Sequence, residues 1–252
     1  MRDQKEVFAD QLALDYSCTA EQVKSGQHIF TRKEYRQGRR IFRGDDALVR
    51  IACVGDTFLV TAEEEMLDWC KEHLAKASPY WFLMYPHMYE LDQKLREFGH
   101  QIGSAHHFYL PGGVERFDGK CPTEGISLKW YEEKDLEVFR DDNPFPEALS
   151  FIRECPDVIA VAAQKGETVL GMAGASRDCG KMWQIGINVT DAGRGMGIGT
   201  YLVTHLKREI LNRGILPFYG TAESHVKSQK VAVQSGFLPA WAELYSMKIK
   251  QG

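Results

Sequence analysis

Alternating apolar and polar positions in the C-terminal half of the chain predict strands separated by amphipathic helices. Apolar residues recur at helical spacing from Ile198 to Leu211, and Gly214 is placed to end that helix. The predicted strands are residues 126–130, 158–163, 169–175, 182–189, 215–221 and 239–249, and the predicted helices are residues 133–139, 145–153, 198–211 and 226–234.

The pattern in the N-terminal half predicts a smaller α/β domain. Gly55 and Asp56 lie between two apolar runs and predict a tight turn that joins two strands. A chain of 252 residues suits one large domain or two modest ones, and we place two domains at residues 1–120 and 121–252. The predicted helices of this half are residues 5–14, 20–24, 63–75 and 88–98, and the predicted strands are residues 48–54, 57–61 and 105–110.

A glycine-rich turn joins the strand that ends at Val189 to the helix that begins at Ile198. Gly195, Gly197 and Gly199 have no side chain that would keep an anion away from the main-chain amides. The first N–H groups of a helix have no intrahelical acceptor and carry partial positive charge, so an anion can bind there without a metal. The turn therefore predicts a binding site for a pyrophosphate group.

Spacing distinguishes between three motifs that bind phosphate through such a turn. A P-loop requires lysine after its last glycine, but Thr200 follows Gly199. A dinucleotide fingerprint requires a third glycine three positions after the second, where this chain has Ile198 or Thr200. The pattern Arg-x-x-Gly-x-Gly remains, and Arg194, Gly197 and Gly199 satisfy it.

This pattern resembles motif A of the GNAT superfamily, the acyl-CoA-dependent N-acyltransferases. The resemblance implies an α+β or mixed α/β fold in which helices flank a central mixed sheet, over about residues 126–250. Asp191 stands where the family often has proline, which alters the turn rather than abolishing it. The alternative is a glycine-rich connection that binds nothing. Three alternating glycines argue against it, because glycine loses the most conformational entropy on folding.

The resemblance also implies which residues hold coenzyme A (CoA). In the family, the amides of the turn bind the pyrophosphate, and the preceding strand pairs with the pantetheine arm as if with an added strand. The residues implied here are Ile187, Asn188 and Val189 in the strand, and Arg194, Gly195, Met196, Gly197, Ile198, Gly199 and Thr200 in the turn and helix.

Residues 225–237 resemble motif B of the same family, which is Asn-x-x-Ser/Ala followed by a short helix and Gly-Phe. Gly236 and Phe237 fit this form, and His225 stands at the asparagine position. The resemblance implies CoA contacts for His225 and Ser228. Many relatives have a tyrosine on this helix that acts as general acid toward the leaving thiolate, but this chain has Ala232 there.

Acetyl transfer from a thioester to an amine requires a neutral amine, a polarised carbonyl and a proton for the thiolate. We expect a main-chain N–H near Asn188 or Val189 to polarise the carbonyl. Glu223, just after the strand at 215–221, is the predicted catalytic base, although its carboxylate equally suits the start of the next helix. Tyr245 is the predicted acid. Glu243 is a second base candidate, and Trp183, Gln184, Asn188, Tyr219, Trp241 and Tyr245 are candidates to contact the acceptor, although core packing explains the aromatic residues at least as well.

Composition limits the partners that we expect. The formal net charge of −4 argues against nucleic acid, so the basic run at residues 31–40 is interpreted as a solvated loop. Six dispersed cysteines form no Cys-x-x-Cys, and neighbouring His106 and His107 would face opposite sides of a strand, so no metal site is predicted. No apolar run is long enough to cross a bilayer and no signal peptide is recognised, so we expect a cytoplasmic protein.

The sequence thus predicts an N-acetyltransferase that moves an acetyl group from acetyl-CoA to a primary amine of a small molecule or a protein. The alternative is a catalytically inactive CoA-binding module with a regulatory or interaction role, because the tyrosine is absent at Ala232. A homodimer is expected by analogy with the superfamily alone.

Overall fold

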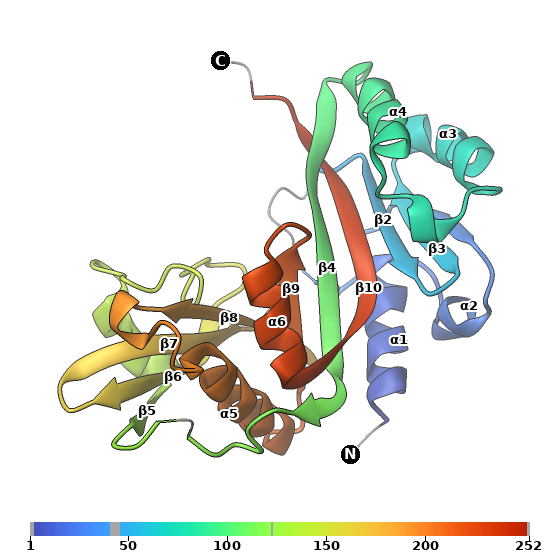
Figure 1. Ribbon diagram of the computed structural model, residues 1–252. Helices are drawn as coiled ribbons and strands as arrows, with labels where there is room; N and C mark the ends of the chain where they lie inside the picture. Colours follow the sequence, from blue (N-terminus) through green and yellow to red (C-terminus); the bar gives the residue numbers. More distant parts are fainter. Residues whose placement is uncertain (1–2, 41–45, 122, 251–252) are drawn as a thin grey trace. The chain divides into compact units, whose positions relative to one another are not determined.

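The computed structural model describes residues 3–40, 46–121 and 123–250 (Figure 1). The chain forms two units. Unit 1 consists of Met1–Phe108 and Ala240–Gly252, and unit 2 consists of Tyr109–Pro239. Strands β4 (His100–Glu115) and β10 (Ser235–Lys248) each begin in one unit and end in the other. The domain boundary predicted between residues 120 and 121 falls within unit 2.

Unit 1 is built around the hairpin predicted at Gly55 and Asp56. Gly55 adopts the left-handed conformation (φ 55°) between β2 and β3, which explains the glycine at this turn. The helices bury apolar side chains against the strands, which follow the order β1-β3-β2-β10-β4. The remaining elements of unit 1 are α1 (Gln4–Asp15), α2 (Ala20–Lys24), β1 (Ile29–Arg32), β2 (Val49–Val54), β3 (Thr57–Ala62), α3 (Glu64–Leu74), η1 (Pro79–Trp81) and α4 (Tyr85–Arg96).

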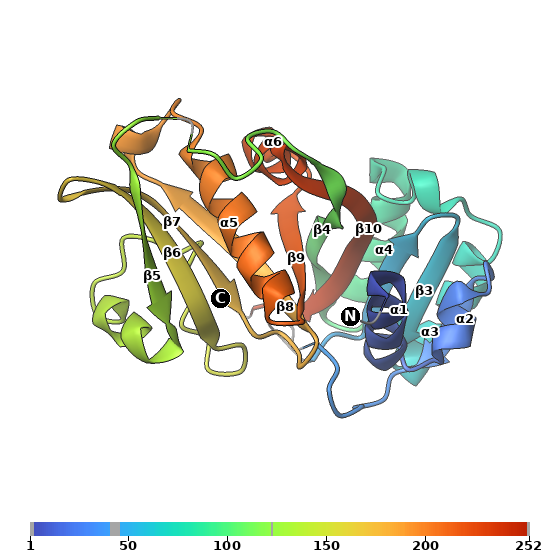
Figure 2. The same ribbon diagram turned by 90° about the horizontal axis from the view of Figure 1, so that it is seen from below.

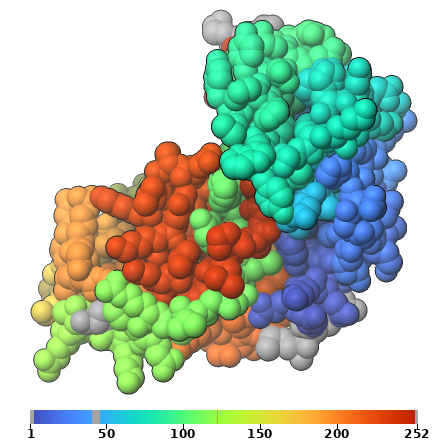
Figure 3. Space-filling model, turned by 45° about the vertical axis from the view of Figure 1, so that its right-hand side comes forward, coloured from blue at the N-terminus to red at the C-terminus, as the bar shows by residue number. Residues whose placement is uncertain are grey.

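Several aromatic side chains of unit 1 are exposed on η1 and α4. Tyr85 and Tyr80 are the most exposed of them, and the surface of this segment faces the viewer in Figure 3. Helix α4 buries only Leu91 and Leu95. Its polar and aromatic positions therefore form surface, whereas the leucines at helical spacing attach it to the core.

Unit 2 contains the mixed sheet that the sequence predicts. Strand order is β4-β9-β8-β7-β6-β5; β8 and β9 are parallel, and the pairs from β8 to β5 are antiparallel. The mixed α/β fold class is therefore confirmed. Its elements are β5 (Ser127–Glu132), η2 (Glu133–Phe139), β6 (Asp157–Lys165), β7 (Thr168–Ser176), β8 (Met182–Val189), η3 (Asp191–Gly193), α5 (Ile198–Asn212), β9 (Leu216–Ala222) and α6 (Val226–Gln234).

The two faces of this sheet carry different cores. Ile159 and Val161 of β6 face the cluster that includes the apolar stripe of α5, which crosses the sheet in Figure 2. Ala160 and Ala162 belong to a second cluster with Phe145 and residues of η2. Because side chains alternate along a strand, the two clusters lie on opposite faces. Helix α6 packs against α5 and β9.

The prediction of a helix at residues 145–153 is wrong. This segment forms turns, with Asn143 accepting from the amide of Phe145 (2.9 Å) and donating to the carbonyl of Leu149 (2.7 Å). Asp157 accepts from the amide of Phe151, a residue in the left-handed conformation (φ 50°). These side-chain bonds satisfy the main-chain groups that a helix would have paired.

Candidate functional site

The glycine-rich turn has the backbone that its sequence predicts. Gly195 and Gly197 both have a φ of 76°, in the left-handed region that other residues avoid, and Gly197 caps α5. A Cβ atom on Gly193 would lie 2.2 Å from the carbonyl oxygen of Leu170, so that glycine allows the turn to pack against β7. The backbone conformation or the close packing at each of these positions therefore favours glycine.

The amides of this turn lack acceptors. Within the part of the chain that the structure describes, the amide of Gly195 and those of residues 197–200 donate no hydrogen bond, and that of Met196 makes only a long contact of 3.4 Å with the carbonyl of Gly193. Residues 194–197 are exposed or half-buried. A row of donors at the start of a 15-residue helix fits an anion such as pyrophosphate.

Arg194 adds a cation beside these amides. Its side chain is 75% exposed and pairs with Asp191 at 2.9 Å, and Asp191 is also exposed. An exposed ion pair of this kind contributes little to stability. Arg194 can therefore exchange Asp191 for a ligand phosphate at low cost.

Strands β8 and β9 separate before either one ends. Their parallel pairing stops at Ile185 and Tyr219, although β8 continues to Val189 and β9 to Ala222. On its other side, β8 stays paired with β7 as far as Val189. We call the unpaired region the split; it comprises residues 186–189 of β8 and 220–222 of β9.

The main-chain groups of Ile187 and Val189 face the split. The amide of Thr190 donates to the carbonyl of Leu170 on the β7 side at 3.0 Å. Hydrogen-bonded positions alternate along an antiparallel ladder, so the odd-numbered residues of β8 turn their main-chain groups toward β9. Ile187 and Val189 thus provide donors for an extended ligand beside β8, next to the glycine-rich turn.

The side chain of Asn188 is engaged within the protein. Its Oδ1 accepts hydrogen bonds from the amides of Glu147 (2.8 Å) and Ala148 (2.9 Å). The CoA contact predicted for Asn188 stays a prediction, because its Oδ1 is bound to this segment and its main-chain groups pair with Met172 of β7. Glu147 was not predicted as part of this site. The signal in the sequence was Gly174 on β7 and Gly186 on β8, because glycine within a strand often marks a close backbone approach.

Motif B lies on α6 beside β9. The hydroxyl groups of Ser228 and Tyr219 are 2.8 Å apart, and burial raises the pKa of Tyr219 to about 12. His225 is exposed at the start of α6, and its side chain makes no capping bond there. Ala232 is fully buried in the cluster beneath α5. The helix thus brings Ser228 to the core of unit 2 and leaves His225 at the surface.

The predicted catalytic residues lie in different parts of the chain. Glu223 is exposed in the turn between β9 and α6, where its carbonyl accepts from Gln229 (2.7 Å). Tyr245 is half-buried on β10, in unit 1, opposite Arg50 of β2. The role of each as base or acid stays a prediction.

Glu243 and Trp241 also belong to unit 1, where they form part of a buried ionic network. Glu243 accepts from Arg40 (2.8 Å) and from Nε1 of Trp241 (2.8 Å), and Arg40 also pairs with Asp15. Arg40 is only 3% exposed. The carboxylate of Glu243 is therefore held in a structural ion pair with Arg40.

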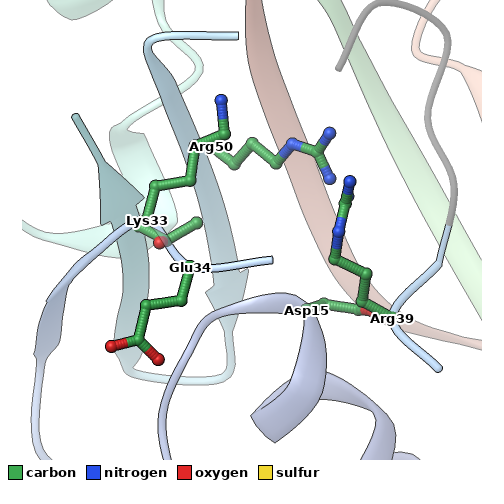
Figure 4. Close-up of a pocket in the computed structure, with 6 residues that line it drawn as sticks. Asp15, Lys33, Glu34, Arg39 and Arg50 are labelled. Carbon is green, nitrogen blue, oxygen red and sulfur yellow. The ribbon is translucent and has the colours of Figure 1, made fainter. Parts of the chain in front are cut away.

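The prediction of a solvated loop at residues 31–40 is wrong at both ends of this run. Thr31 and Arg32 belong to β1, and Arg40 is buried. A small surface pocket in unit 1 is lined by Lys33, Glu34 and Arg39 of this run together with Arg50. The guanidinium groups of Arg39 and Arg50 point toward each other there, whereas the carboxylate of Glu34 points away (Figure 4). Residues 31–40 therefore belong to the folded structure of unit 1.

The cysteines are all free thiols, of which Cys121 is exposed. Burial raises the pKa of both Cys53 and Cys70 to about 12. Over residues 3–40, 46–121 and 123–250, no three His, Cys, Asp or Glu side chains are grouped in a way that could hold a metal ion. Over the same ranges, no helix is long and apolar enough to span a membrane.

Comparison with known proteins agrees with this geometry. Among solved structures, a GCN5-related N-acetyltransferase-like protein from Streptococcus suis aligns with 96% of this chain and 98% of its own, at 10% identity and a TM-score of 0.50, which shows a shared fold. A GNAT-family acetyltransferase structure from Novosphingobium aromaticivorans aligns with 60% of this chain and 69% of its own (17% identity, TM-score 0.42). One from Colwellia psychrerythraea aligns with 59% of this chain and 57% of its own (16% identity, TM-score 0.41).

No curated protein matches the chain by sequence. The family model described as acetyltransferase (GNAT) family matches residues 126–237, which include the split, the glycine-rich turn and α6. Residues 126–237 of this chain therefore form a domain of the acetyltransferase (GNAT) family.

Proposed function

We propose that the chain is an N-acetyltransferase that transfers an acetyl group from acetyl-CoA to a primary amine of a small molecule or a protein. The observation that carries the proposal is the continuous set of donors from the split to the glycine-rich turn. Ile187 and Val189 offer main-chain groups along β8, and the amides of residues 197–200 follow at the start of α5.

The donors match the parts of acetyl-CoA in order along the chain. The amides of Gly195 and residues 197–200, with Arg194, would hold the pyrophosphate. The main chain of Ile187 and Val189 would hold the extended pantetheine arm as an added strand does. When bound, acetyl-CoA supplies the acetyl group as a thioester.

The residues of β8 then act on the acetyl group through fixed dipoles. The amide of Val189 faces the split and is held by a strand that stays paired with β7. It would stabilise negative charge as it develops on the carbonyl oxygen, without reorganisation. Glu223 as base and Tyr245 as acid stay predictions from the sequence that the assay below tests, and a cytoplasmic location and a homodimer are part of the proposal.

A second candidate function is a catalytically inactive CoA-binding module. The observation that favours it is Ala232, which is fully buried at the position where many relatives carry the acidic tyrosine. Both candidates predict CoA binding, and only the enzyme predicts turnover.

Thiol release distinguishes the two functions. The protein is incubated with acetyl-CoA and spermidine, ethanolamine, L-lysine or a lysine-containing peptide, and free thiol is measured over time. The Cys121→Ser variant removes the exposed thiol of the protein from the signal. Amine-dependent release supports the enzyme; tight CoA binding with no release from any amine supports the inactive module.

The base is tested in the same assay. Glu223→Gln is expected to lower kcat by about 100-fold if Glu223 removes the proton from the amine. An unchanged kcat across the pH range would remove Glu223 from the mechanism. Tyr245→Phe tests the acid in the same way.

A further inference from the structure

We propose that Glu147, in place of Glu223, is the general base of the acetyl transfer, and this inference rests on the proposed function. Glu147 lies in the segment between η2 and β6, outside both motifs that resemble the family. Three contacts join this segment to the sheet, two of them with the end of β8 that has separated from β9 and one with β7.

The first contact is made by Asn188. Its Oδ1 accepts from two successive amides, those of Glu147 (2.8 Å) and Ala148 (2.9 Å). Asn188 is the residue between Ile187 and Val189, whose main-chain groups face the split. One side chain therefore fixes the main chain of Glu147 beside the position expected for the thioester.

The second and third contacts are made by two glycines. A Cβ atom on Gly186 would lie 1.8 Å from the carbonyl oxygen of Glu147, and a Cβ atom on Gly174 would lie 2.0 Å from that of Ala148. Gly174 and Gly186 are register partners on β7 and β8. The paired glycines thus leave the space in which the main chain of residues 147 and 148 rests directly on the sheet.

The charge of Glu147 acts on Tyr219, which lies next to the split. Glu147 is exposed, and its negative charge contributes to the raised pKa of Tyr219, after the larger effects of burial and Tyr109. Tyr219 forms the last pair before β8 and β9 separate. Tyr109 on β4 is the other ionisable group that raises the pKa of Tyr219.

The acetyl transfer needs one base from the protein, which takes the proton of the amine. The amine nitrogen forms a bond to the acetyl carbon, and the C–S bond breaks with its electron pair on sulfur. The proton lost by nitrogen passes to the carboxylate of Glu147, and the departing thiolate takes a proton from water. Glu147 then returns its proton to solvent. A positioned carboxylate contributes about 10²–10⁴-fold to such a step.

The test compares Glu147→Gln with Glu154→Gln, an exposed glutamate of the same segment. Glu147→Gln is expected to lower kcat at least 100-fold with spermidine or another accepted amine, whereas its CoA affinity by calorimetry stays within twofold of wild type. Wild-type kcat/KM is expected to fall at acid pH, and this fall is expected to be absent in Glu147→Gln. Glu154→Gln is expected to match wild type in every measurement.

Chemical rescue provides a second measurement. Formate or azide is expected to restore part of the activity of Glu147→Ala, because a small base can enter the space vacated by the carboxylate, and to leave Glu154→Ala unchanged. The inference is overturned if Glu147→Gln keeps kcat within threefold, or if neither anion rescues Glu147→Ala. Failure of the proposed function is distinct, because the wild type would then bind CoA without turnover of any amine.

Discussion

The carbonyl oxygen of Glu147 occupies the space where a side chain on Gly186 would begin, 1.8 Å from the position of its Cβ. A main-chain oxygen cannot rotate away as the end of a side chain can. Gly186→Ala must therefore displace the segment or β8 itself. This single close approach links the sheet to the segment that carries the proposed base.

Gly186→Ala is expected to lower the free energy of unfolding by about 1–3 kcal/mol, the usual range for overpacking, and to lower kcat more than CoA affinity. Gly180→Ala is the matched control, because a Cβ there meets nothing within 4 Å and its φ is not positive. Thermal and urea unfolding measure both variants. Equal stability of the two would contradict the close approach.

Gly195 and Gly214 form a matched pair for the anion site. Both have a φ of 76°, and a Cβ on either meets nothing within 4 Å, so alanine costs about 1–2 kcal/mol of stability at each. Only Gly195 lies in the glycine-rich turn; Gly214 ends α5. Gly195→Ala is expected to weaken CoA binding about tenfold or more, and Gly214→Ala to leave it unchanged. Equal CoA affinity in the two variants, measured by calorimetry, would argue against the pyrophosphate position.

Tyr219 predicts a loss of stability at alkaline pH. Its pKa in the folded protein is about 12, against 10.0 for an ordinary tyrosine, because burial disfavours the phenolate. Between these values the unfolded chain releases the proton while the folded protein keeps it, so stability present below pH 10 is lost as the pH rises toward 12. A difference of two units corresponds to about 3 kcal/mol.

Tyr219→Phe is expected to remove about that much of the alkaline loss, whereas Tyr80→Phe, which changes an exposed tyrosine, is expected to leave it intact. The measurement is urea unfolding at several values between pH 9 and 12. An identical pH dependence in wild type and Tyr219→Phe would show that the phenol is not held neutral by burial.

The buried network of unit 1 predicts a contrast between two arginines. Arg40 bridges Asp15 and Glu243 and is 3% exposed, whereas Arg32 pairs with Glu64 and both side chains are 69% exposed. Arg40→Ala leaves two buried carboxylates without their cation and is expected to cost about 3–5 kcal/mol. Arg32→Ala is expected to cost less than about 1 kcal/mol. Similar unfolding free energies for the two variants would contradict the role of Arg40.

Sequence patterns predicted the parts of this fold whose causes are local. The apolar stripe of α5, its end at Gly214 and the bounds of β8 and α6 follow from periodicity and glycine conformations close by in the chain. Gly195 and Gly197 could be assigned to a turn because only glycine adopts their backbone freely.

Contacts between distant segments could not be predicted in this way. The pairing of Arg40 with Glu243 joins residues far apart in sequence, and the basic run around Arg40 resembles any solvated loop. The pattern predicted a helix at residues 145–153, but Asn143, Asp157 and Asn188 bind main-chain groups of this segment instead. The position of Glu147 could therefore not be predicted from the sequence, because it depends on the pairing of Gly174 with Gly186.

The most direct test of the account is the response of the main-chain amides of residues 195–200 to CoA. Amide resonances of the isotope-labelled protein are followed by ¹H–¹⁵N NMR during titration with CoA, with inorganic pyrophosphate as competitor. We predict saturable shifts of the Gly195 amide and those of residues 197–200 with one common Kd, reversed in part by pyrophosphate. CoA binding at saturation with these amides unmoved, or the absence of any binding, would contradict the account.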